Sequence, residues 1–408
     1  MSDGKRKWSR RDFLKMTGQA GLGAAMLAGG GAANAAGEGP GASPSPKQVP
    51  GRPFGKSGRT VSILSLGGMF DIPSNQLLLK QALRWGVTYW DTADCYGGGA
   101  SEKGIGQYFA KYPDDRSRIF LVTKSDDRDP DGLSRLLDRS LERLNTSYID
   151  LYFVHGISDI DELTEETRKW AEKAKTQGKI RLFGFSTHRN METCLEAAAK
   201  LGWIDGIMMS YNYRLMHTDQ MKKAVDACVA AGIGLTAMKT QGGGAVTIAT
   251  ETELALAGRF LGRGFTDKQA KLKAVWENPN IASICSQMPN LTILMSNISA
   301  ALDKTKLADA DKALLDRYAR ETASGYCAGC AHLCESQVGG CLPISDVMRY
   351  LMYARTYGDR EHAREMFGGI PADLRRNMQT MDYTAAESIC PQKMAIARLM
   401  REASRELA

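Results

Sequence analysis

Between residues 59 and 307, short apolar runs alternate with longer segments in which apolar residues recur every three or four positions. Short, nearly continuous apolar runs are typical of parallel strands that are buried on both faces. A recurrence of three and four, as in Leu133, Leu137 and Leu144, is typical of an amphipathic helix. The pattern predicts strands at residues 61–68, 87–91, 119–124, 149–155, 180–186, 206–211, 234–239 and 281–287, with helices between and after them.

Eight strand–helix units within about 250 residues are typical of a (β/α)8 barrel, the TIM-barrel fold. We therefore predict an α/β protein with such a barrel over residues 59–307. A doubly wound sheet is the competing fold, but no Gly-x-Gly-x-x-Gly phosphate loop follows the first predicted strand. Residues 308–408 lose the alternation and are predicted to form a small, mostly helical module that contains cysteines.

The first 35 residues have the composition of a signal peptide. A basic stretch from Lys5 to Arg11 precedes a weakly apolar stretch at 18–33, and Ala33-Asn34-Ala35 resembles a cleavage site. Within it, residues 9–15 (SRRDFLK) match the twin-arginine pattern. We therefore expect export to the periplasm by the twin-arginine translocase, which carries folded proteins. Residues 36–58 are rich in Gly, Pro, Ser and Ala and are predicted to be a linker.

The net charge of +7 is concentrated in this segment, because the first 35 residues hold six basic and two acidic residues. The remaining chain is nearly balanced, so we expect no nucleic-acid partner. No apolar run of the mature chain is long enough to span a membrane.

Four reactive side chains lie at the ends of three successive predicted strands. Asp91 and Tyr96 follow the second strand, Lys124 ends the third, and His155 ends the fourth. Because the carboxyl ends of barrel strands meet at one mouth, these groups are expected to converge as catalytic residues. An ammonium ion beside a phenol favours the phenolate, so the pKa of Tyr96 is expected to be lowered. The alternative is a buried ion pair with an unrelated histidine.

With these residues in place, the chain resembles the aldo/keto reductase superfamily over residues 59–302. The motifs that carry the resemblance are Asp91-Thr92-Ala93-x-x-Tyr96-Gly97, Val122-Thr123-Lys124, Ser140-Leu141-x-Arg143-Leu144-x-Thr146-x-Tyr148-Ile149-Asp150-Leu151-Tyr152, His155 and Gly184-Phe185-Ser186. The resemblance implies that Tyr96 is the general acid, that Asp91 and Lys124 tune it, and that His155 positions a substrate carbonyl.

The resemblance also implies an NAD(P)(H) site, and here the chain departs from the family. The residues that match its positions are Ser186, Thr187, Met208, Met238, Lys239, Gln287 and Asn297. Thr187 and Met208 replace the usual asparagine and glutamine, and Met238 or Lys239 stands where an aromatic residue usually stacks on the nicotinamide. The loop after Gln287 lacks the basic residues that usually bind a 2′-phosphate, which leaves NADH and NADPH both open.

The nine cysteines are unevenly distributed. Five fall in the last quarter of the chain, and Cys327-x2-Cys330-x3-Cys334 is a spacing at which one loop supplies several thiolates to a single centre. The chain resembles those aldo/keto reductases that end in a ferredoxin-like [4Fe–4S] module, with Cys390, which precedes a proline, as fourth ligand and Cys341 in reserve. A zinc site and two disulfides remain open as alternatives. The other four cysteines, Cys95, Cys194, Cys228 and Cys285, are predicted to be packing residues.

The sequence therefore predicts an exported oxidoreductase that transfers a hydride between a nicotinamide and a small carbonyl or alcohol substrate. The cluster would be structural or would relay electrons, in the second case to a redox partner protein. The alternative is a barrel that serves as a binding or electron-transfer scaffold and no longer turns over nicotinamide. The sequence does not name the substrate.

Overall fold

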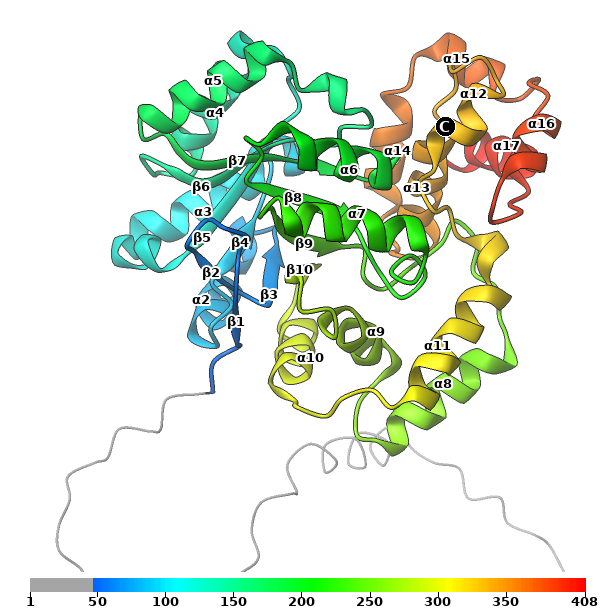
Figure 1. The fold of residues 1–408 in the computed structure, drawn as a ribbon, viewed down its shortest axis with the longest axis horizontal. Helices are drawn as coiled ribbons and strands as arrows, with labels where there is room; N and C mark the ends of the chain where they lie inside the picture. Colours follow the sequence, from blue (N-terminus) through cyan, green and yellow to red (C-terminus); the bar gives the residue numbers. More distant parts are fainter. Residues whose placement is uncertain (1–46) are drawn as a thin grey trace, which may run out of the picture. The chain divides into compact units, whose positions relative to one another are not determined.

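The computed structural model describes residues 47–408, and the predicted signal peptide lies outside this range. Eight parallel strands form a closed barrel in the order β10-β3-β4-β5-β6-β7-β8-β9 (Figure 1). The strands are β3 (Leu64–Gly67), β4 (Tyr89–Asp91), β5 (Phe120–Ser125), β6 (Ile149–Val154), β7 (Ile180–Thr187), β8 (Gly206–Ser210), β9 (Gly234–Met238) and β10 (Ile281–Gln287). The predicted (β/α)8 fold is thus confirmed.

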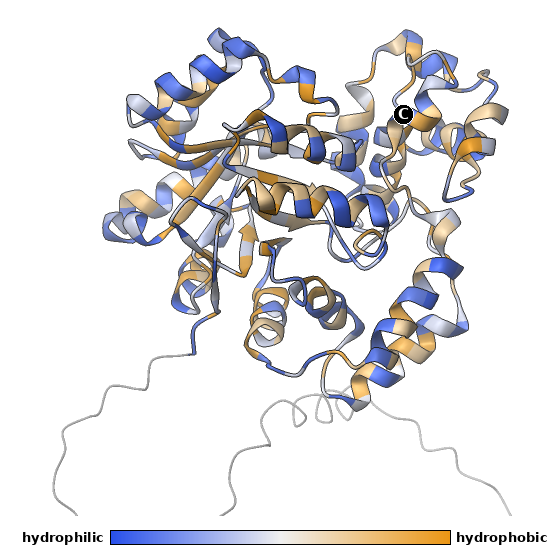
Figure 2. Cartoon of the chain, in the orientation of Figure 1, coloured by the Kyte–Doolittle hydropathy of each residue, from blue (hydrophilic) through white to orange (hydrophobic). Residues whose placement is uncertain are grey.

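Helices surround the barrel and bury one apolar face each against it. Figure 2 shows apolar residues along the strands and polar residues on the outer faces of α4 (Pro130–Arg143) and α5 (Glu165–Thr176). In α4, the predicted stripe packs inward through Leu133 and Leu137. The remaining outer helices are α2 (Gln76–Arg84), α3 (Ala100–Lys111), α6 (Met191–Leu201), α7 (Asp219–Ala230), α9 (Asp267–Trp276) and α10 (Leu291–Leu302). Helix α8 (Glu251–Gly262) instead buries Leu256 and Phe260 in a separate apolar cluster. Helices α8 and α9 both lie between β9 and β10.

A hairpin precedes the barrel. Its strands are β1 (Gly51–Pro53) and β2 (Thr60–Ser62), and β1 lies inside the segment that was expected to be a linker. The predicted first strand at 61–68 is in fact two strands, β2 and β3. Phe54, in the hairpin turn, is completely buried inside the barrel, where a Cβ on Gly206 or Gly234 would collide with its ring. The hairpin therefore closes the end of the barrel opposite the site.

The C-terminal region is helical and has an apolar cluster of its own. Its helices are α11 (Asp309–Glu321), α12 (Ala331–Ser336), α13 (Ile344–Arg355), α14 (Arg360–Gly368), α15 (Ala372–Asn377), α16 (Thr384–Ile389) and α17 (Ile396–Glu406). Arg189, just after β7, forms ion pairs with Glu335 (2.6 Å) and Asp346 (3.0 Å) and so fastens the module to the barrel. Among the described residues, no helix has both the length and the apolarity that crossing a membrane requires.

Candidate active site

The four predicted catalytic residues meet at the carboxyl end of neighbouring strands. Asp91 ends β4, Lys124 lies in β5, and His155 directly follows β6. Tyr96 begins a short 3-10 helix, Tyr96–Gly99, whose three glycines all have positive φ. Such backbone angles are accessible to glycine at little cost, and they turn the chain sharply after Tyr96. The turn is anchored because Arg143 donates a hydrogen bond to the carbonyl of Asp94 (3.0 Å).

Lys124 is the centre of the group. Its Nζ lies 2.8 Å from the carboxylate of Asp91, 2.6 Å from the carbonyl oxygen of Thr92 and 3.4 Å from the hydroxyl of Tyr96. Lys124 and Asp91 are 1% and 2% exposed, so the ion pair is shielded from water. The pair holds an ammonium ion against the phenol without leaving a net buried charge.

The expected direction of the Tyr96 pKa shift was wrong. Burial in the mouth of the barrel raises the pKa of Tyr96 well above the ordinary 10.0, and the negative charge of Asp91 adds to this increase. Burial likewise raises the pKa of Asp91, against the opposing effect of Lys124. A carboxylate beside the ammonium ion offsets the stabilisation that the phenolate would otherwise receive. The Tyr96 phenol is therefore neutral over the whole physiological range.

Breaking this ion pair should be costly for the fold. Replacing Lys124 by methionine leaves the Asp91 carboxylate buried without its partner, and we expect the free energy of unfolding to fall by about 3–5 kcal/mol. Denaturant unfolding followed by circular dichroism measures the loss. The matched control is Lys179→Met, which breaks a pair with Asp138 at 38% and 58% side-chain exposure and should cost less than about 1 kcal/mol. If the two variants lose the same free energy of unfolding, the buried ion pair does not contribute the expected stability.

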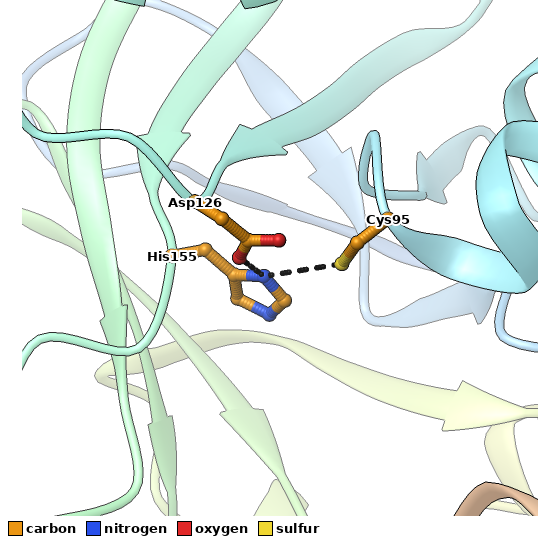
Figure 3. A group of neighbouring side chains, drawn as sticks. All are labelled: Cys95, Asp126 and His155. Atoms are coloured by element: carbon orange, nitrogen blue, oxygen red, sulfur yellow. Dashed lines mark hydrogen bonds and ion pairs between the residues drawn. The ribbon is translucent and has the colours of Figure 1, made fainter. Parts of the chain in front are cut away.

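His155 is oriented by a residue that sequence reasoning missed. Its Nδ1 lies 2.8 Å from Oδ1 of Asp126, and its ring faces that of Tyr96 edge-on with centroids 5.8 Å apart. Cys95, expected to be a packing residue, is instead exposed, with Sγ 3.7 Å from the same Nδ1 (Figure 3). Asp126 could have been predicted as a site residue, because it lies two residues after Lys124 and directly follows a strand.

Four of the residues expected at the nicotinamide site lie in β7 to β9, with Ser186, Thr187 and Met238 at strand ends and Met208 in the middle of β8. The Oγ of Ser186 accepts a hydrogen bond from the amide of Gly156 (3.0 Å), and Thr187 donates to the carbonyl of Arg189 (2.8 Å). Met208 and Met238 belong to the apolar cluster inside the barrel. The two methionines thus fill space where the family usually places a polar and an aromatic side chain.

The other three are engaged elsewhere. Lys239, with φ of 57°, donates a hydrogen bond to the hydroxyl of Tyr353 on α13 (3.0 Å). Gln287 bonds to the carbonyl of Met69, and Asn297 donates to the hydroxyl of Ser286 (3.0 Å). Tyr353 was not predicted as a site residue, because nothing in the sequence indicates which face of α13 meets the barrel.

The cysteines expected to bind a cluster come together at one cavity. Cys327, Cys330, Cys334 and Cys390 all line it, together with Pro391 and apolar side chains of the module. Burial raises the pKa of Cys327, and it raises the pKa of Cys330 and of Cys334 to about 12 in each case. A free thiol in such surroundings is protonated, so a metal centre is what would hold these sulfurs as thiolates.

The four sulfurs that line the cavity are not gathered around a single point. No three of the four lie within 4.8 Å of one another, as judged over the described residues. Four thiolates on a single zinc ion would lie about 3.8 Å apart, given a tetrahedron with Zn–S bonds of about 2.3 Å. A single zinc ion would therefore require these sulfurs to move closer together. Cys341 lies outside the cavity, is exposed, and donates to the carbonyl of Val338 (3.1 Å).

The comparisons with known proteins agree with this geometry. A sequence profile of the aldo/keto reductase family matches residues 64–282, more than half of the chain. The aldo-keto reductase AFTS1 of Alternaria alternata is 29% identical over 228 residues, which are 45% of this chain and 62% of that protein. Aldo-keto reductase yakc [NADP(+)] of Schizosaccharomyces pombe is 38% identical over 128 residues, 28% of this chain and 36% of that protein. The chain therefore matches less than two thirds of the length of these curated relatives.

Solved structures give the same result for the fold. The thermostable aldo-keto reductase Tm1743 aligns with a TM-score of 0.56 at 27% identity, covering 65% of this chain and 98% of that chain. AKR11C1 of Bacillus halodurans, at 23% identity and a TM-score of 0.56, shares the fold over 66% of this chain and 96% of its own. From the motifs, the barrel, the strand-end residues and the matched profile, we conclude that the chain belongs to the aldo/keto reductase family.

Proposed function

We propose that the chain is an oxidoreductase that interconverts a small carbonyl compound and its alcohol with a nicotinamide cofactor. The observation that carries the proposal is the contact of Lys124 Nζ with both Asp91 (2.8 Å) and the hydroxyl of Tyr96 (3.4 Å). Among the relatives, the name of the S. pombe protein includes NADP(+), and another is the L-galactose dehydrogenase of Arabidopsis thaliana. These names support nicotinamide chemistry and leave the substrate of this chain undetermined.

In carbonyl reduction, the nicotinamide supplies a hydride to the carbonyl carbon, and the oxygen then needs a proton. Tyr96 donates the proton from its hydroxyl, because its raised pKa keeps the group neutral until an alkoxide forms beside it. The Lys124 ammonium ion then stabilises the phenolate that remains, and Asp91 holds Lys124 in place. The ring of His155 lies across from that of Tyr96, so the carbonyl oxygen would bind between the two side chains.

The pH dependence of reduction tests this assignment. The acid form of Tyr96 is the neutral phenol, so a pKa above 10.0 keeps the donor populated as the pH rises. We expect kcat/KM for an aromatic aldehyde with NADPH or NADH to stay level from about pH 7 to about pH 9.5 and to fall only at higher pH. Circular dichroism over the same range separates inactivation from unfolding.

Two other outcomes of this assay have definite meanings. A loss of activity centred near pH 8 would mean that the pKa of the proton donor is lowered, against the burial of Tyr96 beside Asp91. A folded protein that neither binds nor oxidises either nucleotide would favour the alternative of a non-catalytic scaffold. Met208, Met238 and the bond between Lys239 and Tyr353 motivate that alternative, because all three alter the expected nicotinamide site.

For the C-terminal module, we propose a [4Fe–4S] cluster held by Cys327, Cys330, Cys334 and Cys390. Their common cavity and the spread of their sulfurs support the assignment. Cys327 also lines a second cavity, which reaches Lys239 and Ser210 at the ends of β8 and β9. A cluster so placed next to the barrel mouth suits an electron relay, with a redox partner protein as donor or acceptor, as well as a structural role.

We further propose that the chain is exported to the periplasm by the twin-arginine translocase. The proposal rests on the sequence of residues 1–35, in which Arg10 and Arg11 are the paired arginines. Replacing both by lysine should leave the protein in the cytoplasmic fraction of the cell. Equal periplasmic amounts of variant and parent would exclude this route.

A further inference from the structure

Cys95, Asp126 and His155 bring three different metal-binding groups together at the barrel mouth. Their ligand atoms, Sγ, a carboxylate oxygen and a ring nitrogen, all lie within 4.8 Å of one another (Figure 3). The three residues follow β4, β5 and β6, so they are far apart in sequence and converge only in the folded barrel. Cys95 and Asp126 are exposed, which leaves the group open to an ion from solution.

The arrangement differs from that of a nucleophile activated by a histidine. In such a relay, the thiol approaches one ring nitrogen while the carboxylate holds the other. In this chain both Cys95 Sγ (3.7 Å) and Asp126 Oδ1 (2.8 Å) approach the same nitrogen, Nδ1. Figure 3 shows Nε2 on the far side of the ring, away from both partners. The three donor atoms therefore surround one point in space.

The distances suit a tetrahedral ion at that point. With Zn–N bonds of about 2.0 Å, Zn–S of about 2.3 Å and Zn–O of about 2.0 Å, tetrahedral angles place N and S about 3.5 Å apart and N and O about 3.3 Å apart. The observed separations are 3.7 Å and 2.8 Å. On this geometry the carboxylate would move away from Nδ1 by about 0.5 Å and the sulfur would approach it by about 0.2 Å, so that a hydrogen bond becomes a shared coordination sphere.

The neighbours of the group hold it in shape. Arg128 donates one hydrogen bond to the carbonyl of His155 (2.9 Å) and another to the carbonyl of Asp126. Its remaining nitrogen pairs with Glu162 (3.0 Å), so the guanidinium is itself fixed. Outer contacts of this kind orient metal ligands and contribute to affinity.

We propose that Cys95, Asp126 and His155 form a site for Zn²⁺ or another divalent ion of the first transition row, with one coordination position open. An ion on Nδ1 leaves the proton of the neutral imidazole on Nε2. When Nδ1–H is instead donated to Asp126, neutral His155 presents only an acceptor at Nε2. The ion would thus turn the free side of His155 into a hydrogen-bond donor. Binding is measured without turnover, so the inference can fail independently of the proposed reaction.

The test is a Co²⁺ titration of the purified full-length chain, followed by a Zn²⁺ competition with a chromophoric chelator. The parent should show a thiolate-to-cobalt absorption band that Zn²⁺ abolishes. Cys95→Ala should remove this band and weaken binding by at least about 100-fold, and Asp126→Asn should weaken it by about 10–100-fold. The matched control, Cys341→Ala, removes an exposed thiol outside this group and should titrate like the parent.

The C-terminal thiols are the competing location for the ion. A variant with Cys334→Ala should therefore retain the Cys95-dependent band. If the band and affinity survive in Cys95→Ala and Asp126→Asn, or if the band is lost in Cys334→Ala instead, the proposed site is wrong. The Asp126 variant keeps the test decisive even if Cys95→Ala folds poorly.

Discussion

Replacing Tyr96 by phenylalanine is expected to lower kcat/KM for carbonyl reduction by about 10²–10⁴-fold, the range that a positioned general acid contributes. The change removes one oxygen atom, which lies 3.4 Å from Lys124 Nζ. The ring, its packing against His155 and the buried pair of Lys124 with Asp91 all remain. Because the hydroxyl acts on the alkoxide, kcat should fall much more than the affinity for nucleotide. Steady-state kinetics and nucleotide-fluorescence titration measure the two quantities.

Tyr148→Phe is the matched control for this variant. Tyr148 lies just before β6, at the opposite end of the strand from His155, and its ring stacks with Arg116 and Arg181. Removing its hydroxyl should leave turnover within about twofold, since the group is remote from the reacting atoms. Undiminished carbonyl reduction by Tyr96→Phe would rule out Tyr96 as the proton donor.

The second large effect is expected at the thiol cavity. Replacing Cys390 by serine should lower the iron content of anaerobically purified protein from about four atoms per chain to near zero, with loss of the visible absorption of a [4Fe–4S] centre. Cys390 is buried and lines the cavity with Cys327, Cys330 and Cys334. It reaches them from a segment that follows α16, so the proposed fourth ligand joins the other three only in the folded module.

The matched control is Cys341→Ser, because sequence spacing alone left this residue in reserve as a ligand. Its thiol is exposed and is not part of the cavity lining. The control protein should keep its iron and its colour. Loss of iron in Cys341→Ser with retention in Cys390→Ser would reverse the assignment. Iron-free parent protein after anaerobic preparation would reject the cluster altogether.

The C-terminal module contacts the mouth of the barrel, where the nicotinamide is expected to bind. Tyr353 of α13 accepts a hydrogen bond from Lys239 at the end of β9, and Arg355 of the same helix donates to the carbonyl of Ala245 (3.1 Å). The module thus reaches the barrel mouth next to the residues expected to hold nicotinamide. A ligand at that mouth and a centre at Cys327 would lie on two sides of one cavity.

Local patterns were enough to predict the barrel and the convergence of Asp91, Tyr96, Lys124 and His155 at its mouth. Continuous apolar runs and helical stripes report burial directly, which is why the eight barrel strands and the stripe of α4 were predicted close to their observed bounds. The convergence of Asp91, Lys124 and His155 could also be predicted, because residues at the carboxyl ends of successive parallel strands meet in any closed barrel. The first strand was predicted too long because β2 and β3 follow one another with only Ile63 between them.

Only the tertiary structure decided what surrounds these residues. The sequence predicts an ammonium ion near the Tyr96 phenol, but it does not predict how deeply the phenol is buried. Burial reversed the predicted direction of the pKa shift of Tyr96. Asp126 and Cys95 share one nitrogen of His155, and Tyr353 meets Lys239, through contacts between segments that are distant in the chain. Contacts between distant segments also explain why Cys390, and not Cys341, lines the thiol cavity. Desolvation and long-range contact depend on how the elements pack, and no local pattern of residues encodes them.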